Sequence, residues 1–197
     1  MFLGAHARLA TRWSFGGRRL RHVVGALLLM SHAYCVALPA QADSSEYELK
    51  AAFIARFVEF IDWPSIVGGA SRPFSICVFG AHPIEQPLAK LPELLHVKGN
   101  EVEVHRIMQP EQATECGILF IPSNAAASLP EIRRVTQNSA VLTIGDTPGF
   151  LQRGVLINFF TEDERLRFEI QLPNARAAGF TVSARLLKLA RVIEQNQ

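Results

Sequence analysis

Three short runs of the chain are apolar almost throughout, and each ends in a glycine or a turn. They lie at residues 73–80, 116–121 and 140–146. A continuous apolar run of this length is typical of a strand that is buried on both faces. A fourth strand, at 101–107, alternates polar and apolar residues, which indicates one exposed face. Helices are expected between these strands, at 83–95 and 125–137. This rhythm predicts βαβ units around a parallel sheet.

The pattern changes in the last quarter of the chain. Residues 154–160 and 165–172 form two further expected strands, and only residues 161–164 join them. So short a connection predicts an antiparallel hairpin. Apolar residues after Ser183 fall at helical spacing and predict a closing helix that this serine caps. The expected fold is therefore α/β, a single compact domain with a mainly parallel central sheet, an antiparallel C-terminal hairpin and flanking helices.

A helix is also expected at residues 43–63, ahead of the first strand. Its phenylalanines, which include Phe57 and Phe60, recur at helical spacing, and Pro64 ends the helix just after Trp63. This broad aromatic face has two interpretations. It packs into the core, or part of it stays exposed as a docking surface for a partner.

The first 42 residues have the pattern of a secretory signal peptide. A basic region without acidic residues comes first, with Arg8, Arg12, Arg18, Arg19 and Arg21. An apolar stretch follows at 23–30, and residues 40–42 are the small-x-small motif that signal peptidase reads. We expect cleavage after Ala42. The alternative is a transmembrane anchor, but an anchor needs about 20 consecutive apolar residues, and polar residues and Pro39 interrupt this run.

Removal of residues 1–42 changes the charge of the chain. The full sequence has 20 Lys and Arg against 18 Asp and Glu, a net charge of +2. Five of the basic residues leave with the signal peptide, so residues 43–197 carry 15 basic and 18 acidic side chains, a net charge of −3. The 155 residues that remain (197 − 42) are enough for one domain with its own core. Without a basic cluster it lacks the footprint of a nucleic-acid-binding protein.

Two cysteines, Cys77 and Cys116, remain after the signal peptide, because Cys35 lies within it. In an oxidising compartment, two cysteines in a small domain indicate one disulfide bond. The alternative is a pair of buried thiols that pack as small apolar side chains. Spacing alone does not place the two sulfur atoms face to face.

Few residues form a pattern that is typical of catalysis. The sequence has no GxSxG elbow and no phosphate-binding loop. His82, His96 and His105 lie too far apart in sequence for the short spacing of a metal-binding motif. We therefore expect no catalytic residues, no metal and no cofactor.

The carboxyl ends of the apolar strands are the positions where an α/β fold tends to bind a ligand. Gly80, Ser123 and Asp146 lie at the ends of the three apolar runs and are the candidate ligand-binding residues. The alternative for Asp146 is a structural role, since aspartate commonly caps a turn. These observations favour a sensing or binding protein over an enzyme.

Several ordered blocks of the sequence resemble the YfiR family of periplasmic regulators. The blocks are residues 48–64, 74–80, 116–123, 141–146 followed by Phe150 and Gly154, 167–170, 177–180 and 183–190. Each block is short, but together and in this order they cover essentially all of residues 43–197.

The resemblance implies a non-enzymatic regulatory protein in the periplasm. Members of the family are thought to repress an inner-membrane diguanylate cyclase by binding its periplasmic sensory domain. Release of the cyclase raises cyclic di-GMP and promotes biofilm formation. An outer-membrane lipoprotein can sequester the repressor, redox state can tune it, and members can form homodimers.

The family's disulfide maps onto Cys77 and Cys116. A second pair in some members falls near Leu151 and Asn158, where this chain has no cysteine. This difference puts a two-disulfide redox mechanism in doubt here.

The expected partner-binding residues are Phe57, Phe60 and Trp63 on the opening helix and Glu169 on the hairpin. An alternative function is a periplasmic small-molecule sensor that acts with a sensor histidine kinase or another membrane receptor, with its pocket at the strand ends named above. An unrecognised hydrolase is a third interpretation, which the lack of catalytic motifs disfavours.

Overall fold

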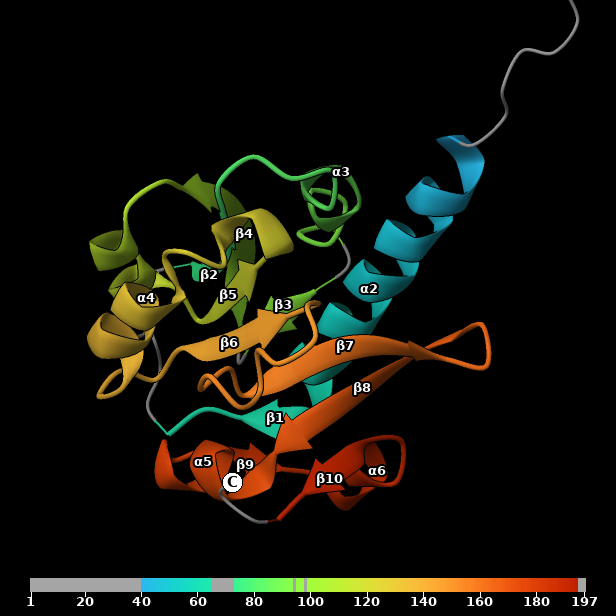
Figure 1. Cartoon of the computed structure of the whole chain (residues 1–197). Helices are drawn as coiled ribbons and strands as arrows, with labels where there is room; N and C mark the ends of the chain where they lie inside the picture. Colours follow the sequence, from blue (N-terminus) through green and yellow to red (C-terminus); the bar gives the residue numbers. More distant parts are fainter. Residues whose placement is uncertain (1–39, 65–72, 94, 98, 195–197) are drawn as a thin grey trace, which may run out of the picture. The chain divides into compact units, whose positions relative to one another are not determined.

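The computed structural model describes residues 40–64, 73–93, 95–97 and 99–194 of the 197-residue chain (Figure 1). Up to residue 39, the expected signal peptide lies outside these residues. The described part begins with helix α2 (Ala40–Phe60), so the expected cleavage point falls within the first turn of this helix. None of the helices in the described part has the length and apolar character that crossing a membrane requires.

An eight-stranded sheet forms the centre of the domain, in the order β10-β8-β7-β6-β5-β2-β4-β3. The strands are β2 (Phe74–Phe79), β3 (His96–Val97), β4 (Asn100–Ile107), β5 (Ile118–Ile121), β6 (Leu142–Gly145), β7 (Ile157–Glu162), β8 (Arg165–Gln171) and β10 (Arg191–Ile193). Neighbouring strands are parallel except in the pairs β7–β8 and β3–β4. The expected α/β fold, with a mainly parallel sheet and a C-terminal hairpin, is confirmed.

Side chains of the central strands alternate between two hydrophobic cores, one on each face of the sheet. In β5, Ile118 and Phe120 enter one core, and Leu119 and Ile121 enter the other. Successive residues of a strand point to opposite faces. A strand that is covered on both faces is therefore mostly apolar. Strand β5 is an unbroken apolar run, and β6 has one polar residue, Thr143, whose buried hydroxyl accepts a hydrogen bond from the backbone N–H of Leu156.

Helix α2 belongs to one core, and helix α4 (Leu129–Thr136) belongs to the other (Figure 1). Phe57 of α2 is fully buried, with its ring centroid 5.9 Å from that of Phe159 and 5.0 Å from that of Phe168. On the other face, Ile132 of α4 packs into the core that holds the two cysteines. The aromatic face of α2 is therefore mainly a core surface, and it fixes the helix against the hairpin.

The closing helix that the sequence predicts after Ser183 is wrong in its length. Helix α6 (Ala184–Leu187) is short, although Ser183 does cap it by accepting a hydrogen bond from the backbone N–H of Leu186. The chain then enters β10, which pairs with β8 in parallel. The backbone hydrogen bonds of this pairing override the helical spacing of the apolar residues.

The other connections are short helices. They are α3 (Glu85–Leu88), α5 (Leu172–Ala177) and the 3₁₀ helices η1 (Pro110–Glu115) and η2 (Ser123–Ala125). The helix predicted at 83–95 is confined to α3. After α3, the backbone N–H groups of Lys90 and Leu91 donate to carbonyls three residues earlier, and Pro92 has no N–H with which to resume the α-helical pattern.

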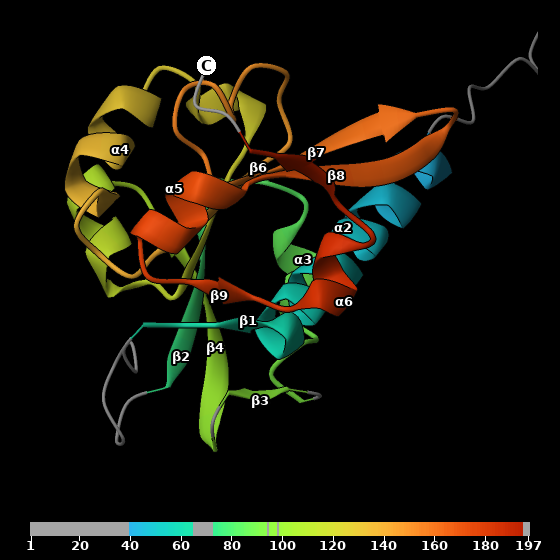
Figure 2. The ribbon, with the colours of Figure 1, turned by 90° about the horizontal axis from the view of Figure 1, so that it is seen from below.

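A second, two-stranded sheet connects the end of α2 to the C-terminal region. Strand β1 (Ile61–Asp62) pairs with β9 (Thr181–Val182) (Figure 2). Trp63 follows β1, between two phenylalanine rings, and its indole N–H donates to the carbonyl oxygen of Gly117 at 3.1 Å. Trp63 thereby ties the segment after the helix to the sheet. The helix ends at Phe60, earlier than the sequence predicts, because Ile61 and Asp62 pair with β9 as a strand.

Candidate functional site

The order of the parallel strands creates a switch point between β2 and β5, at the carboxyl ends of these strands. The chain crosses from β2 to β4 on one side, and then from β5 to β6 on the other side. In open α/β sheets, ligands bind outside the carboxyl ends of the strands at such a point. Gly80 directly follows β2, Ser123 comes two residues after β5, and Asp146 directly follows β6. The structure therefore brings the three candidate ligand-binding residues to the same edge of the sheet.

Asp146 at this edge is paired with a cation from helix α2. The ammonium nitrogen of Lys50 lies 2.8 Å from Oδ2 of Asp146 and 2.8 Å from Oε1 of Glu46. The side chains of Lys50 and Asp146 are only 6% and 11% exposed. Burial alone would lower the pKa of Lys50, but the hydrogen bonds to Asp146 and Glu46 outweigh burial and raise it. Lys50 therefore stays charged, and α2 closes this part of the switch point.

His82 lies in the loop after β2 and contacts both α2 and the sheet. Its ring centroid is 5.1 Å from that of Tyr47 on α2 and 5.5 Å from that of Phe120 on β5. Its Nδ1 accepts a hydrogen bond from the backbone N–H of Ile84 at 3.3 Å. Burial, the largest influence, lowers the pKa of His82. The imidazole is therefore neutral at neutral pH, with Nδ1 as its acceptor.

An open hollow of about 390 Å³ adjoins His82. Its lining consists of Ala81, His82, Pro83, Glu85, Gln86 and Arg106. Arg106 of β4 donates through two nitrogens to the carboxylate of Glu85, at 3.0 and 2.8 Å. Partial burial alone would raise the pKa of Glu85, but the hydrogen bonds from Arg106 and from the His82 backbone outweigh it and lower the pKa. The hollow is open to solvent, and its lining combines apolar surface with the paired charges of Glu85 and Arg106.

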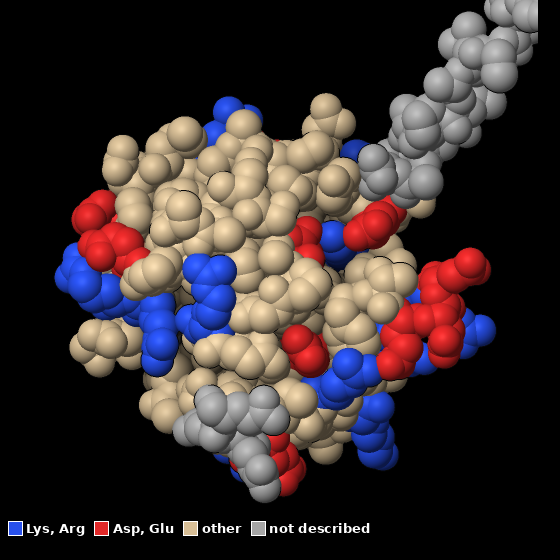
Figure 3. All heavy atoms as spheres, viewed as in Figure 1, with Lys and Arg blue, Asp and Glu red and all other residues tan. Residues whose placement is uncertain are grey.

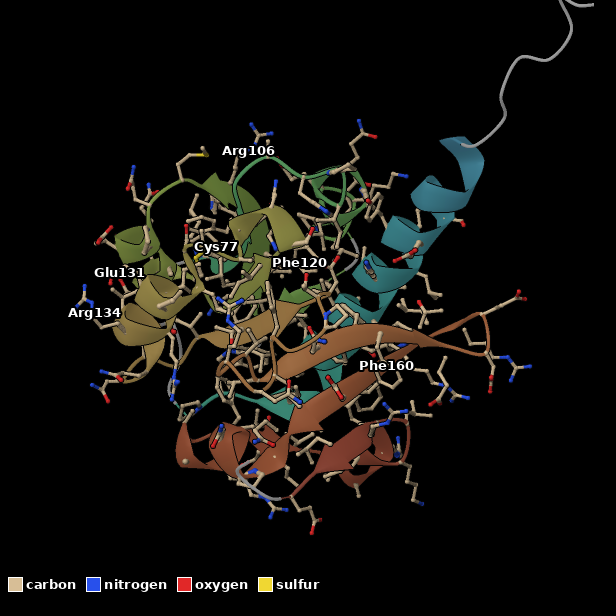
Figure 4. The ribbon with its side chains drawn as sticks, in the orientation of Figure 1. Cys77, Arg106, Phe120, Glu131, Arg134 and Phe160 are labelled. Carbon is tan, nitrogen blue, oxygen red and sulfur yellow. A yellow bond between two sulfur atoms is a disulfide. The ribbon has the colours of Figure 1, made fainter. Side chains whose placement is uncertain are left out.

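Cys77 in β2 and Cys116 just before β5 form a disulfide bond, as the sequence predicts (Figure 4). Their Cα atoms are 5.9 Å apart, and both residues are buried in the core on the α4 side of the sheet. A polar cavity of about 250 Å³, lined in part by His105 and Glu115, adjoins the disulfide.

The four residues expected to bind a partner do not form one surface. Phe57 is fully buried and Trp63 is 6% exposed, so neither reaches the surface in this conformation. Phe60 is half-buried and packs against the core on the α2 side. Glu169 of β8 is half-buried, and its neighbour Phe168 points toward α2. Because neighbouring strand residues point to opposite faces, Glu169 lies on the face of the sheet away from Phe60.

Glu169 shares its face of the hairpin with several charged residues and one aromatic ring. We call this set, Phe160, Glu162, Arg167, Glu169 and Arg191, the hairpin face. Arg191 lies over the ring of Phe160, with its Cζ 4.0 Å from the centroid, and pairs with Glu162. Figure 4 labels Phe160 on the hairpin, and Figure 3 shows acidic and basic side chains gathered at the hairpin end. Exposed arginine and half-buried aromatic side chains are typical of protein–protein contact sites.

Within the described residues, no group of three His, Cys, Asp or Glu side chains is arranged to hold a metal ion. His105 instead pairs with Glu103 at the surface, with 2.9 Å between Nε2 and Oε2. The chemistry that the switch point and the hairpin face offer is hydrogen bonding, ion pairing and aromatic contact.

The comparison with known protein families identifies the family of this chain. The model of the YfiR/HmsC-like family matches residues 47–191, nearly the whole of the described domain. The chain belongs to the YfiR/HmsC-like family. This family is regulatory and non-catalytic, and membership supports, at family level, a periplasmic regulator of the cyclic di-GMP pathway that interacts with a membrane-bound partner.

A search of curated proteins finds no match. Among solved structures, the chain is similar to a conserved domain protein from Vibrio cholerae O1 biovar El Tor, with 14% sequence identity and a TM-score of 0.47. The likeness covers 74% of this chain and 59% of that one, so this chain spans less than two thirds of the length of that protein.

Lys50 is the residue of the switch point that sequence reasoning missed in this YfiR/HmsC-like protein. It lies four residues before Ile54 and seven before Phe57, both of which are fully buried, so it occupies the apolar stripe of α2. A buried charge needs a partner, and a lysine in an apolar stripe was the available signal. The partner, Asp146, is 96 residues away, and no local pattern reveals it.

Proposed function

We propose that this YfiR/HmsC-like protein represses an inner-membrane diguanylate cyclase by binding the periplasmic sensory domain of the cyclase, and so controls cyclic di-GMP and biofilm formation. The observation that carries the proposal is the family match over residues 47–191. The hairpin face supports it, because it presents charged side chains around a half-buried ring where a partner domain can dock.

Repression by binding requires a difference between two affinities. The protein must bind the inactive conformation of the sensory domain more tightly than the active one, because equal affinity shifts no equilibrium. Turning a population from 1:99 to 99:1 takes about 10⁴-fold, or about 5.5 kcal/mol. A few central residues, each contributing about 2 kcal/mol or more, can supply this difference. Within the hairpin face, Glu169 and the stacked pair of Phe160 and Arg191 are our candidates.

Deletion of the gene tests the proposal in cells. We expect cyclic di-GMP and biofilm mass to rise after deletion, and expression of the wild-type protein to lower them again. A variant with Glu169→Lys and Arg167→Glu should fail to complement. The matched control, Arg134→Gln, lies on the outer side of α4, away from the hairpin (Figure 4), and should complement fully. Unchanged cyclic di-GMP after deletion, in a strain with an intact cognate cyclase, contradicts the proposal.

The proposal also includes the location and the assembly of the protein. We expect export to the periplasm with cleavage after Ala42, sequestration by an outer-membrane lipoprotein, and a homodimer. Mass spectrometry of the periplasmic protein checks the new N-terminus, which should be Asp43. Light scattering checks the dimer, and co-purification checks the lipoprotein.

A second candidate function is a periplasmic small-molecule sensor that acts with a sensor histidine kinase or another membrane receptor. The hollow beside His82, which lies two residues after Gly80, favours it, whereas the carboxylate of Asp146 is already paired with Lys50. A ligand that binds the folded protein raises its melting temperature. A thermal-shift screen of periplasmic metabolites in which no compound stabilises the protein argues against this function.

A further inference from the structure

His82 is held in a way that only the neutral imidazole satisfies. Its Nδ1 accepts the hydrogen bond from the backbone N–H of Ile84. A protonated imidazole carries N–H groups on both nitrogens and has no acceptor. Protonation of the ring and this hydrogen bond therefore exclude each other.

The titratable groups around His82 come from α2, α3, β4 and the residue after β6, and the charged ones among them are already paired. Helix α2 contributes Tyr47, whose ring contacts that of His82, and Lys50. Lys50 pairs with Glu46 on the same helix and with Asp146, which follows β6. Helix α3 contributes Glu85, which pairs with Arg106 of β4. Both carboxylates that act on the ring, Asp146 and Glu85, are thus bound to other cations. An imidazolium at this position would be a further cation beside the Lys50 ammonium.

The contact between His82 and Tyr47 links this chemistry to helix α2. Tyr47 lies one turn before Lys50, and together they form the contacts of the first turns of α2 with the carboxyl edge of the sheet. Figure 1 shows α3, which directly follows the His82 loop, beside this half of α2. A change at His82 therefore acts on the first turns of α2, while Phe57 keeps the second half packed.

We propose that His82 makes the packing of the first turns of α2 against the carboxyl ends of the strands sensitive to pH. We call the packed arrangement the seated state, and acidification releases these turns from it. This inference rests on the proposed function, to which it adds an acid signal. The proposed function places the protein in the periplasm, which lies outside the membrane that maintains cytoplasmic pH. The seating itself is a property of the fold and can be measured without any cyclase.

The direction follows from proton linkage. The pKa of His82 is lowered from 6.5 in the folded state, mainly by burial. As pH falls below about 6.5, the released state binds the proton more readily than the seated state, so the seated state loses stability. The loss grows as pH falls toward the folded pKa and stops below it. Each unit between the two pKa values corresponds to about a tenfold change in the equilibrium.

Hydrogen exchange of the purified mature protein at pH 7.5 and pH 5.5, corrected for intrinsic rates, tests the proposal. We expect amides of residues 45–52 to exchange several-fold faster at pH 5.5, while amides of β5 and β6 do not change. His82→Asn, whose side-chain oxygen can accept the Ile84 bond without titrating, should abolish the response. His105→Asn is the matched control, since His105 is exposed and pairs with Glu103, and it should keep the response.

Three results overturn the proposal: no pH response in the wild type, the same response in His82→Asn, or an equal acceleration in β5 and β6. If His82→Asn does not fold, an NMR titration of the wild-type His82 ring decides, and a midpoint at or above 6.5 overturns the proposal. Since these measurements involve no partner, their failure is distinct from a failure of cyclase repression.

Discussion

Replacement of Lys50 by methionine tests the buried ion pair at the switch point. Methionine keeps most of the length of the side chain and removes its charge, so the carboxylate of Asp146 loses its cation while only 11% exposed. Removal of one partner from a buried pair costs about 3–5 kcal/mol. We expect the low end, about 3 kcal/mol, because Asp146 keeps a hydrogen bond from the hydroxyl of Thr147 at 3.4 Å. For a domain of this size, that loss lowers the melting temperature by about 6–12 °C.

Urea denaturation of a double-mutant cycle measures the coupling directly. Lys50→Met and Asp146→Leu should each destabilise the protein, whereas the double variant should come within about 1 kcal/mol of the wild type, because an apolar pair of similar volume avoids the desolvation of two charges. Arg134→Met, at the exposed pair with Glu131, is the control and should barely move the midpoint. A Lys50→Met loss below about 1 kcal/mol, or strict additivity in the cycle, would refute this reasoning.

Two further predictions concern the core. The double variant Cys77→Ala, Cys116→Ala should lose about 4 kcal/mol by the chain-entropy estimate for a loop of this length, measured by urea denaturation against the wild type with and without reductant. A wild type that is unchanged by reductant contradicts it. Trp63→Phe should lose about 1–2 kcal/mol, because the indole hydrogen bond to Gly117 disappears and a small cavity remains; a melting temperature equal to that of the wild type contradicts this role of Trp63.

The sequence predicts the fold well where one physical requirement dominates. Strands β2, β5 and β6 are covered on both faces and are mostly apolar, with Ser75 and Thr143 as exceptions, so their apolar runs identify them. The closing helix was predicted wrongly because the three residues of β10 are too few to show a strand pattern of their own. Their pairing with β8 is a long-range effect, and helical spacing of nearby apolar residues carries no information about it.

The candidate site is predictable only in part, for the same reason. The carboxyl ends of parallel strands share an edge, so Gly80, Ser123 and Asp146 could be placed together from the strand order alone. The side chains that pack against these strand ends could not be predicted, because Lys50 and Tyr47 reach them from a helix far away in sequence. Helical spacing likewise identified the face of Phe57, but the depth of its burial depends on the hairpin that covers it.

The measurement that tests the account most directly is the binding of the purified domain to the periplasmic sensory domain of a diguanylate cyclase from the same genome, by titration calorimetry. We predict saturable binding that weakens at least about tenfold, or about 1.4 kcal/mol, when Arg167 and Glu169 are reversed in charge, with no change for Arg134→Gln. Absence of binding to every such sensory domain, by a protein whose fold is intact by circular dichroism, would contradict the account.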